Sequence, residues 1–190
     1  MTSRHIDIEL IRSFDRHLQE KGLAYTASII GGAAIMLVAS SLRPTGDIDS
    51  ILSIPQDIKD AIVEFARKNS IKETWFNDNA SRNYREFVKS GEDVFIHQVF
   101  SGSSLNMYTP SIHTLLISKI YPMLDRADEG HDLADIENLI NAQLVKIEDL
   151  EKAISTFEFE IRFEEDGDVR KDSWELVKSL CKFMLDTFAK

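Results

Sequence analysis

A pair of glycines followed by two spaced carboxylates constrains this chain more than any other feature. Gly31 and Gly32 open an apolar run, and Asp47 and Asp49 follow with Ile48 between them. Side chains two residues apart in a β-strand lie on the same face. Asp47 and Asp49 are therefore predicted to stand side by side, with Ile48 turned into the core. Converging carboxylates suit Mg²⁺ that also holds substrate phosphates, and glycine lets the backbone approach such a ligand because it has no Cβ.

The hydrophobic periodicity predicts an α/β (α+β) fold, with a mixed sheet flanked by helices and a helical C-terminal part. We expect helices over 5–21, 33–42, 55–69, 111–125, 131–142, 147–156 and 171–188. We expect strands over 23–30, 47–54, 73–76, 84–88 and 94–100. The predicted organisation is a core of residues 1–109, with a helical part of residues 110–190 packed on it.

Composition narrows the classes of function. The chain has 190 residues, of which 43% are hydrophobic, so it can bury a core. Its formal net charge of −10 argues against a general duplex-binding module, which needs a basic face, but does not exclude a nucleotide as ligand. No apolar run approaches the ~20 residues of a membrane-spanning helix, and the N-terminus lacks the apolar core of a signal peptide. We therefore expect a cytoplasmic protein without a membrane partner.

The first motif resembles the nucleotidyltransferase superfamily, whose fold is polymerase-β-like. The residues that carry the resemblance are the glycine pair, a short helix, and then Arg43, Thr45, Asp47 and Asp49. In detail the chain is similar to the branch that contains the AbiEii toxins of bacterial toxin–antitoxin systems and related uncharacterised proteins.

The second half of the chain supports this branch. Lys119, Arg126, Asp132 and Asp135 resemble its helical Lys…Arg…Lys/Arg-Asp-Leu-x-Asp pattern, with His131 before Asp132. The resemblance covers residues 23–140.

The resemblance implies transfer of a nucleoside monophosphate from an NTP, with Mg²⁺ or Mn²⁺ on Asp47 and Asp49. The Gly31–Gly32 turn would hold the triphosphate, and Thr45 belongs to the same nucleotide-binding motif. Lys119, with help from Arg43, would neutralise the leaving pyrophosphate. The acceptor is an RNA end, a protein or a small molecule, and an antitoxin is a possible partner.

Lys119 also stands out on its own, because it falls within an apolar helical face where a charge is costly unless paired or snorkelling. It either snorkels at the edge of that face, contacts a phosphate or pairs with Asp135. Arg126, Asp132 and Asp135 equally suit an ion-pair network between helices. Arg43 is either a clamp on a phosphate or carboxylate, or a solvated arginine.

One departure from the superfamily bears on activity. Active members usually place a third carboxylate in the middle of a later strand, but the predicted strand 94–100 has His97 and Gln98 at its centre. Asp93, at the leading edge, is the remaining candidate for a metal ligand. Without a third carboxylate no evident base deprotonates an attacking hydroxyl. The alternative is a catalytically degenerate protein that only binds a nucleotide or a protein partner.

A second alternative starts from the helical half. His113, His131, Asp132 and Asp149 superficially resemble the ligands of HD-type metal phosphohydrolases. That interpretation leaves the glycine pair and the two spaced aspartates unexplained.

Aromatic residues could hold a base by stacking. The candidates are Trp75, Tyr84 and Phe87. With β-like neighbours, such residues more often pack in a core.

Overall fold

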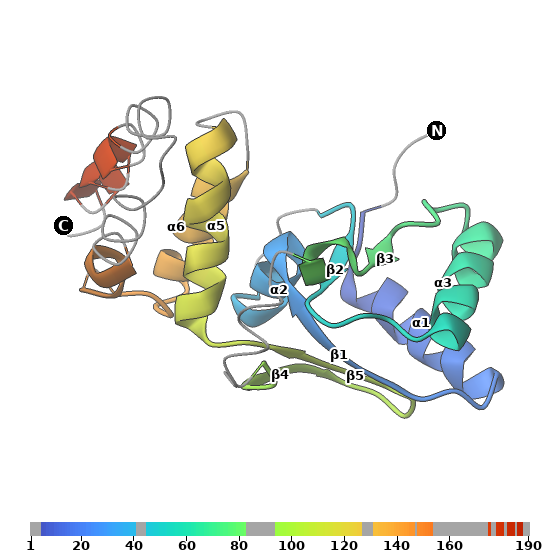
Figure 1. The fold of residues 1–190 in the computed structure, drawn as a ribbon. Helices are drawn as coiled ribbons and strands as arrows, with labels where there is room; N and C mark the ends of the chain where they lie inside the picture. The colour runs from blue at the N-terminus through green and yellow to red at the C-terminus, as the bar shows by residue number, and fades with distance from the viewer. Residues whose placement is uncertain are drawn as a thin grey trace. The chain divides into compact units, whose positions relative to one another are not determined.

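The fold was analysed in a computed structural model (Figure 1). It describes residues 5–40, 45–82, 94–126, 131–146, 148–153, 175, 178–180, 182–184 and 186–187. The chain divides into two compact units, Met1–Ser111 and Ile112–Lys190. Because compactness does not test independent folding, the predicted domains 1–109 and 110–190 stay a prediction.

The first unit contains a mixed sheet with flanking helices, which confirms the predicted α/β class. Its helices are α1 (Ile8–Glu20), α2 (Gly31–Val38), α3 (Gln56–Asn69) and the 3-10 helix η1 (Asn79–Arg82). Its strands are β1 (Tyr25–Ile30), β2 (Ile48–Ser50), β3 (Phe76–Asn77), β4 (His97–Ser101) and β5 (Leu105–Thr109). The described strands form a five-stranded sheet in the order β3-β2-β1-β5-β4. The β1–β2 and β4–β5 pairs are antiparallel, and the β1–β5 and β2–β3 pairs are parallel.

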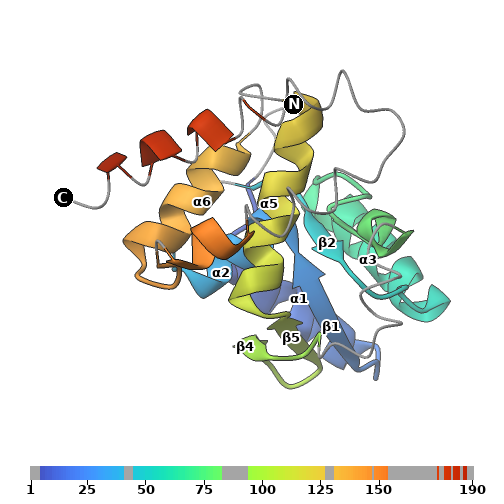
Figure 2. The same cartoon turned by 60° about the vertical axis from the view of Figure 1, so that its left-hand side comes forward.

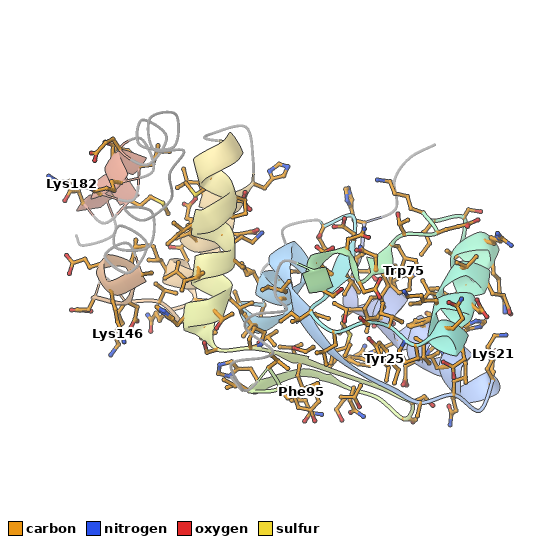
Figure 3. The ribbon with its side chains drawn as sticks, in the orientation of Figure 1. Lys21, Tyr25, Trp75, Phe95, Lys146 and Lys182 are labelled. Atoms are coloured by element: carbon orange, nitrogen blue, oxygen red, sulfur yellow. The ribbon has the colours of Figure 1, made fainter. Side chains whose placement is uncertain are left out.

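An aromatic cluster fills the space between α1, α3 and the sheet. Phe14 of α1 lies 5.2 Å from both Phe65 of α3 and Trp75, measured between ring centroids. Trp75 is only 1% exposed, so this candidate for base stacking is a core residue (Figure 3). Tyr84 and Phe87 lie outside the described residues. The helices α1 and α3 contact one another and lie side by side in both ribbon views (Figures 1 and 2).

The strand register assigns each β2 side chain to a face of the sheet. Ile29 is opposite Ser50 and Ile30 is opposite Asp49, and opposed residues share a face. The hydroxyl groups of Tyr25 and Ser50 lie 3.4 Å apart on the face that carries the aromatic cluster. The opposite face, called here the Asp49 face, carries Asp49 and Ile30.

The interior strand β5 was not predicted. Its alternating burial would have indicated a strand, with Leu105, Met107 and Thr109 buried and the residues between them half-buried. The strand ends directly before Pro110, at the predicted boundary between the core and the helical part, and its five residues form only a short alternating pattern. The strand matters because it lies beside β1 and joins β4 to the rest of the sheet.

Asp15 of α1 fixes the turn between β4 and β5. Its carboxylate accepts hydrogen bonds from the backbone N–H groups of Ser103, Ser104 and Leu105, at 3.1, 2.8 and 2.7 Å. Burial raises the pKa of Asp15, but these three N–H groups outweigh it and hold the pKa below its usual value. A Cβ built at Gly102 would overlap the Asp15 carboxylate, so glycine is required there.

The described part of the second unit is helical, as predicted for the C-terminal region. It contains α5 (Ile112–Arg126) and α6 (Asp132–Asn141), which pack together, and residues 148–153 are also helical. Residues 175, 178–180, 182–184 and 186–187 are helical too. Among the described residues, no helix is long and apolar enough to span a membrane.

We expect Asp15→Asn to lower the free energy of unfolding at pH 7 by about 1–3 kcal/mol, because it weakens charge-assisted bonds to backbone N–H groups. The stability that a lowered carboxyl pKa provides is present above the unfolded pKa of about 4 and is lost as the pH falls through the folded pKa. The difference between wild type and variant should therefore shrink below about pH 4. Urea unfolding across pH measures it, with exposed Glu20→Gln on the same helix as the control. An equal difference at pH 7 and pH 3 would contradict this account.

Candidate functional site

The glycine pair forms the turn from β1 into α2. Ile30, the last residue of β1, has extended backbone, and Gly31 follows with a positive φ of 77°. Glycine adopts this conformation readily, whereas a residue with a Cβ is strained there. Ile30 provides no side-chain cap to the helix. The first-turn N–H groups of α2 are therefore donors of the kind that bind phosphate at helix starts.

The Asp49 carboxylate lies against this turn. A Cβ built at Gly31 would lie 3.1 Å from Asp49 Oδ2, which is tighter than an ordinary van der Waals contact. The cause is the register, since Asp49 is opposite Ile30 at the end of β1. The two parts of the sequence motif are thus adjacent in space, and the absence of a Cβ at residue 31 keeps them close.

Asp47 lies outside the strand in which it was predicted. The expected strand covered residues 47–54, but β2 begins at Ile48 and ends at Ser50. The ladder cannot continue toward Asp47, because the chain opposite it has already turned into α2 at Gly31. Asp47 is exposed and Asp49 is half-buried, while Ile48 is fully buried as predicted.

Thr45 holds the loop that carries Asp47. Its hydroxyl donates to the Asp47 carbonyl oxygen at 3.2 Å, and its own carbonyl accepts from the Ile6 N–H at 2.9 Å. These bonds fix the backbone before β2, so Thr45 is a positioning residue for Asp47. Arg43 and Asp93 lie outside the described residues.

Asp78 fixes the other end of β2. It accepts from the Ile54 N–H at 2.9 Å and contacts Lys59 Nζ at 2.9 Å. Burial raises the pKa of Asp78, but these two partners outweigh it and hold the pKa below its usual value. Both loops that flank Asp49 are therefore held by hydrogen bonds.

The observed strand β4 carries no carboxylate at the positions expected for the third ligand. His97 is opposite Thr109, and Gln98 is opposite Tyr108, which is itself beside Ser28 of β1. Ser28 lies two residues before Ile30, so Gln98 shares the Asp49 face and His97 lies on the other face. The side chain of Gln98 donates to Asn106 Oδ1 at 3.3 Å.

Lys119 forms buried ion pairs within the second unit. Its Nζ lies 3.1 Å from Asp132 Oδ1 and 2.7 Å from Asp135 Oδ2, and all three side chains are nearly inaccessible. The snorkelling interpretation of Lys119 is therefore wrong, and the predicted pairing with Asp135 is present. The side chain of Arg126 lies outside the described residues.

Two of the four residues considered for an HD-type centre, Asp132 and Asp149, have other partners. His113 and Asp149 line a cavity of about 210 Å³ with apolar neighbours. However, Asp132 is bound to Lys119, and Asp149 Oδ2 accepts from the Lys146 N–H at 2.9 Å. Among the described residues, no group of three or more His, Cys, Asp or Glu side chains is arranged to hold a metal.

Residues 8–182 match the model of a family described as nucleotidyltransferases of unknown function, DUF6036. The chain belongs to this family. No curated protein and no solved structure matches the chain. Membership confirms the resemblance to nucleotidyltransferases and implies an NTP substrate, with a divalent metal as the usual cofactor. The Asp49 carboxylate beside the glycine turn fits such a metal, because Mg²⁺ prefers hard oxygen ligands and is bound through one or two carboxylates together with substrate phosphates.

Two glycine substitutions test the close approach of Gly31 to Asp49. Gly22 and Gly31 both have positive φ, but a Cβ at Gly22 would meet nothing within 4 Å. We expect Gly22→Ala to cost about 1–2 kcal/mol of unfolding free energy, from backbone strain alone. Gly31→Ala should cost more, because it also displaces the Asp49 carboxylate. Denaturant unfolding of both variants measures the difference, and equal losses would contradict the close approach.

Removing the Lys119 ammonium takes a cation away from two buried carboxylates, those of Asp132 and Asp135. We expect Lys119→Met to lower the free energy of unfolding by about 3–5 kcal/mol. The triple variant with Asp132→Asn and Asp135→Asn should recover part of that loss, because it removes the uncompensated charges. Thermal and urea unfolding test both, with exposed Lys146→Met as the matched control. If Lys119→Met were as stable as Lys146→Met, the ion pairs of Lys119 would contribute nothing to the free energy of unfolding.

Proposed function

We propose that this protein transfers a nucleoside monophosphate from an NTP to a hydroxyl group of an acceptor. The observation that carries the proposal is the close approach of the Asp49 carboxylate to Gly31 at the start of α2, where an added Cβ would lie 3.1 Å from Oδ2. It brings phosphate-binding N–H groups and a metal-binding oxygen to one point. In the reaction the acceptor oxygen bonds to the α-phosphorus and gives its proton to the proposed third carboxylate, the bond between the α-phosphorus and the oxygen that bridges it to the β-phosphorus breaks, and pyrophosphate leaves.

Each residue of the motif has a role in this proposal. Asp47 and Asp49 hold Mg²⁺ or Mn²⁺, which when bound neutralises the charge of the phosphates. The N–H groups of Gly31 and Gly32 donate to triphosphate oxygens. Thr45 keeps Asp47 in place through its hydrogen bond to the Asp47 carbonyl.

Three further assignments rest on the resemblance. Asp93 is the proposed third carboxylate, and it precedes Val94, whose carbonyl accepts from the Ser28 hydroxyl on the Asp49 face. Arg43 is the proposed clamp on the phosphates. Lys119 is proposed to help neutralise pyrophosphate as a second role, since its ammonium already contacts Asp132 and Asp135.

The resemblance also suggests a biological setting. We infer that the protein belongs to the AbiEii-like branch and acts as the toxin of a toxin–antitoxin pair. The acceptor is an RNA end, a protein hydroxyl or a small molecule. The net charge of −10 favours a protein or a small molecule over a long nucleic acid.

A second candidate function follows from strand β4. His97 and Gln98 occupy the positions at which active relatives are expected to carry a carboxylate. A protein that lacks this base would bind NTP and metal without transferring the nucleotide. Both candidate functions require binding of NTP and metal, but only the first includes transfer of the nucleotide.

The test is transfer of label from each α-labelled NTP, with Mg²⁺ or Mn²⁺, into cell extract and total RNA. We expect label with the wild type, and at least a roughly 100-fold loss in the Asp47→Asn/Asp49→Asn double variant, because it removes both proposed metal ligands. Asp57→Asn/Asp60→Asn on the exposed side of α3 is the matched control.

Transfer retained by the double variant would overturn the assignment of the site. If nothing is labelled, thermal shift with NTP and metal decides between the candidates. A shift in melting temperature without transfer favours the catalytically degenerate protein. The absence of any shift would contradict both candidate functions.

A further inference from the structure

The second unit contains a cavity of about 210 Å³ that the proposed function does not use. Its lining comes from α5, from the chain that follows α6 and from the helical residues 148–153. The helices α5 and α6 contact one another and lie side by side in both ribbon views (Figures 1 and 2). Four of the lining side chains are apolar and two are polar. They are Ile112, His113, Leu116, Leu144, Val145 and Asp149.

The apolar walls are held by packing and by backbone hydrogen bonds. Leu116 is fully buried, and Val145 is 4% exposed. The N–H groups of Leu144 and Val145 donate to the Leu139 carbonyl oxygen at 3.0 and 3.3 Å, which fixes the chain directly after α6. Such walls favour a ligand with an apolar body, because its surface is removed from water on binding.

The two polar side chains have hydrogen-bonding capacity that the protein does not use. Asp149 Oδ2 accepts from the Lys146 N–H at 2.9 Å, but no side chain in the described ranges pairs with the Asp149 charge. His113 is half-buried and makes neither a hydrogen bond nor an ion pair with another described residue. A carboxylate accepts hydrogen bonds only, and an imidazole accepts at one nitrogen when neutral. Both groups can therefore accept from an N–H of one ligand.

The charges around the cavity favour a cation as that donor. Asp149 is exposed, so its carboxylate lies at the rim of the cavity. The described residues from 146 to 153 include three acids, Glu148, Asp149 and Glu151, against the two bases Lys146 and Lys152. The whole chain has a formal net charge of −10. A hydrogen bond from an ammonium to a carboxylate is about twice as strong as a neutral one, so Asp149 favours an amine over an alcohol.

The volume restricts the ligand to a small molecule. A cavity of about 150 Å³ holds benzene, whereas pockets for drug-sized ligands measure about 300–1,000 Å³. The cavity of about 210 Å³ therefore fits one ring with a short arm, and it is too small for an NTP.

We propose that this cavity binds a small primary amine with an apolar body of about one ring. The body packs against Leu116, Leu144 and Val145, and the ammonium donates to the Asp149 carboxylate and to a ring nitrogen of His113. The site lies within the second unit and does not depend on the proposed nucleotide site of the first.

The test uses the whole chain with isotope-labelled Ile, Leu and Val methyl groups, so that NMR reports binding residue by residue. Phenethylamine is the probe. We expect saturable shifts of the Ile112, Leu116, Leu144 and Val145 methyl signals, with a Kd of about 1 mM, the order expected for a ligand of this size. Phenethyl alcohol, which has no charge, should bind about 10-fold more weakly, and phenylpropionate, which is anionic, more weakly still.

Matched variants test the two polar groups. Asp149→Asn removes the charge but keeps an oxygen that can accept from the Lys146 N–H. We expect it to bind phenethylamine about 10-fold more weakly and phenethyl alcohol equally well. His113→Phe keeps a ring and removes both nitrogens, so it should weaken amine binding about 3-fold.

Glu148→Gln is the matched control, because it removes an equal charge from an exposed neighbour that does not line the cavity. It should change the affinity by less than about 2-fold, since solvent screens an exposed charge. Thermal melting verifies that each variant is folded. If a variant is not, the comparison of the three probes on the wild type still tests the proposal.

Three results would overturn the proposal. One is the absence of saturable methyl shifts at the cavity with phenethylamine. Another is equal affinity for the amine, the alcohol and the carboxylate, because the site would then not select a cation. The third is an equal loss in Asp149→Asn and Glu148→Gln, because the general surface charge rather than Asp149 would then attract the amine. None of these results bears on the proposed nucleotide site, which is tested by transfer of label.

Discussion

The pairing of Ile30 with Asp49 is the constraint on which the rest of the site depends. A slip of one residue in an antiparallel pair moves every side chain to the opposite face. Such a slip between β1 and β2 would bury Asp49 and expose Ile48, which is fully buried in the observed register. Burial of Ile48 on one face of the sheet thus fixes the Asp49 carboxylate on the other face. Gly31 completes the arrangement, because its positive φ turns the chain into α2 at the level of Asp49.

The sequence predicts the elements whose apolar pattern is long. Both α1 and α3 follow their helical stripes closely, and the residues directly before them, Asp7 and Pro55, are typical of helix starts. The bounds of the short strands depend on pairing with residues distant in the sequence, which a local pattern does not reveal. The strand β2 is shorter than predicted because its partner ends at Gly31. The strand β5 was missed because its five residues alternate only briefly before Pro110.

The same distinction holds for the site. The proximity of the glycine pair to Asp49 follows from the antiparallel pairing of β1 with β2 on either side of α2, which the strand–helix–strand order of the sequence permits but does not require. The sequence suggests several roles for Lys119, including pairing with Asp135, but does not decide between them. The pairing depends on how α5 packs on α6. The placement of His113 and Asp149 around one cavity depends on the path of the chain after α6. Long-range contacts of this kind cannot be predicted from local sequence patterns.

Two pairs of aspartates in this chain show how environment separates structural from chemical carboxylates. Asp132 and Asp135 are buried with the ammonium of Lys119 between them, so their charge is compensated inside the second unit. Asp47 is exposed, and Asp49 is half-buried beside a glycine turn, so solvent reaches both side chains. A metal bound at the first pair would have to displace a buried lysine, at a large electrostatic cost. A metal proposed at Asp47 and Asp49 would not have to displace a buried lysine. The proposed metal site is therefore better placed at Asp47 and Asp49 than at the buried pair Asp132 and Asp135.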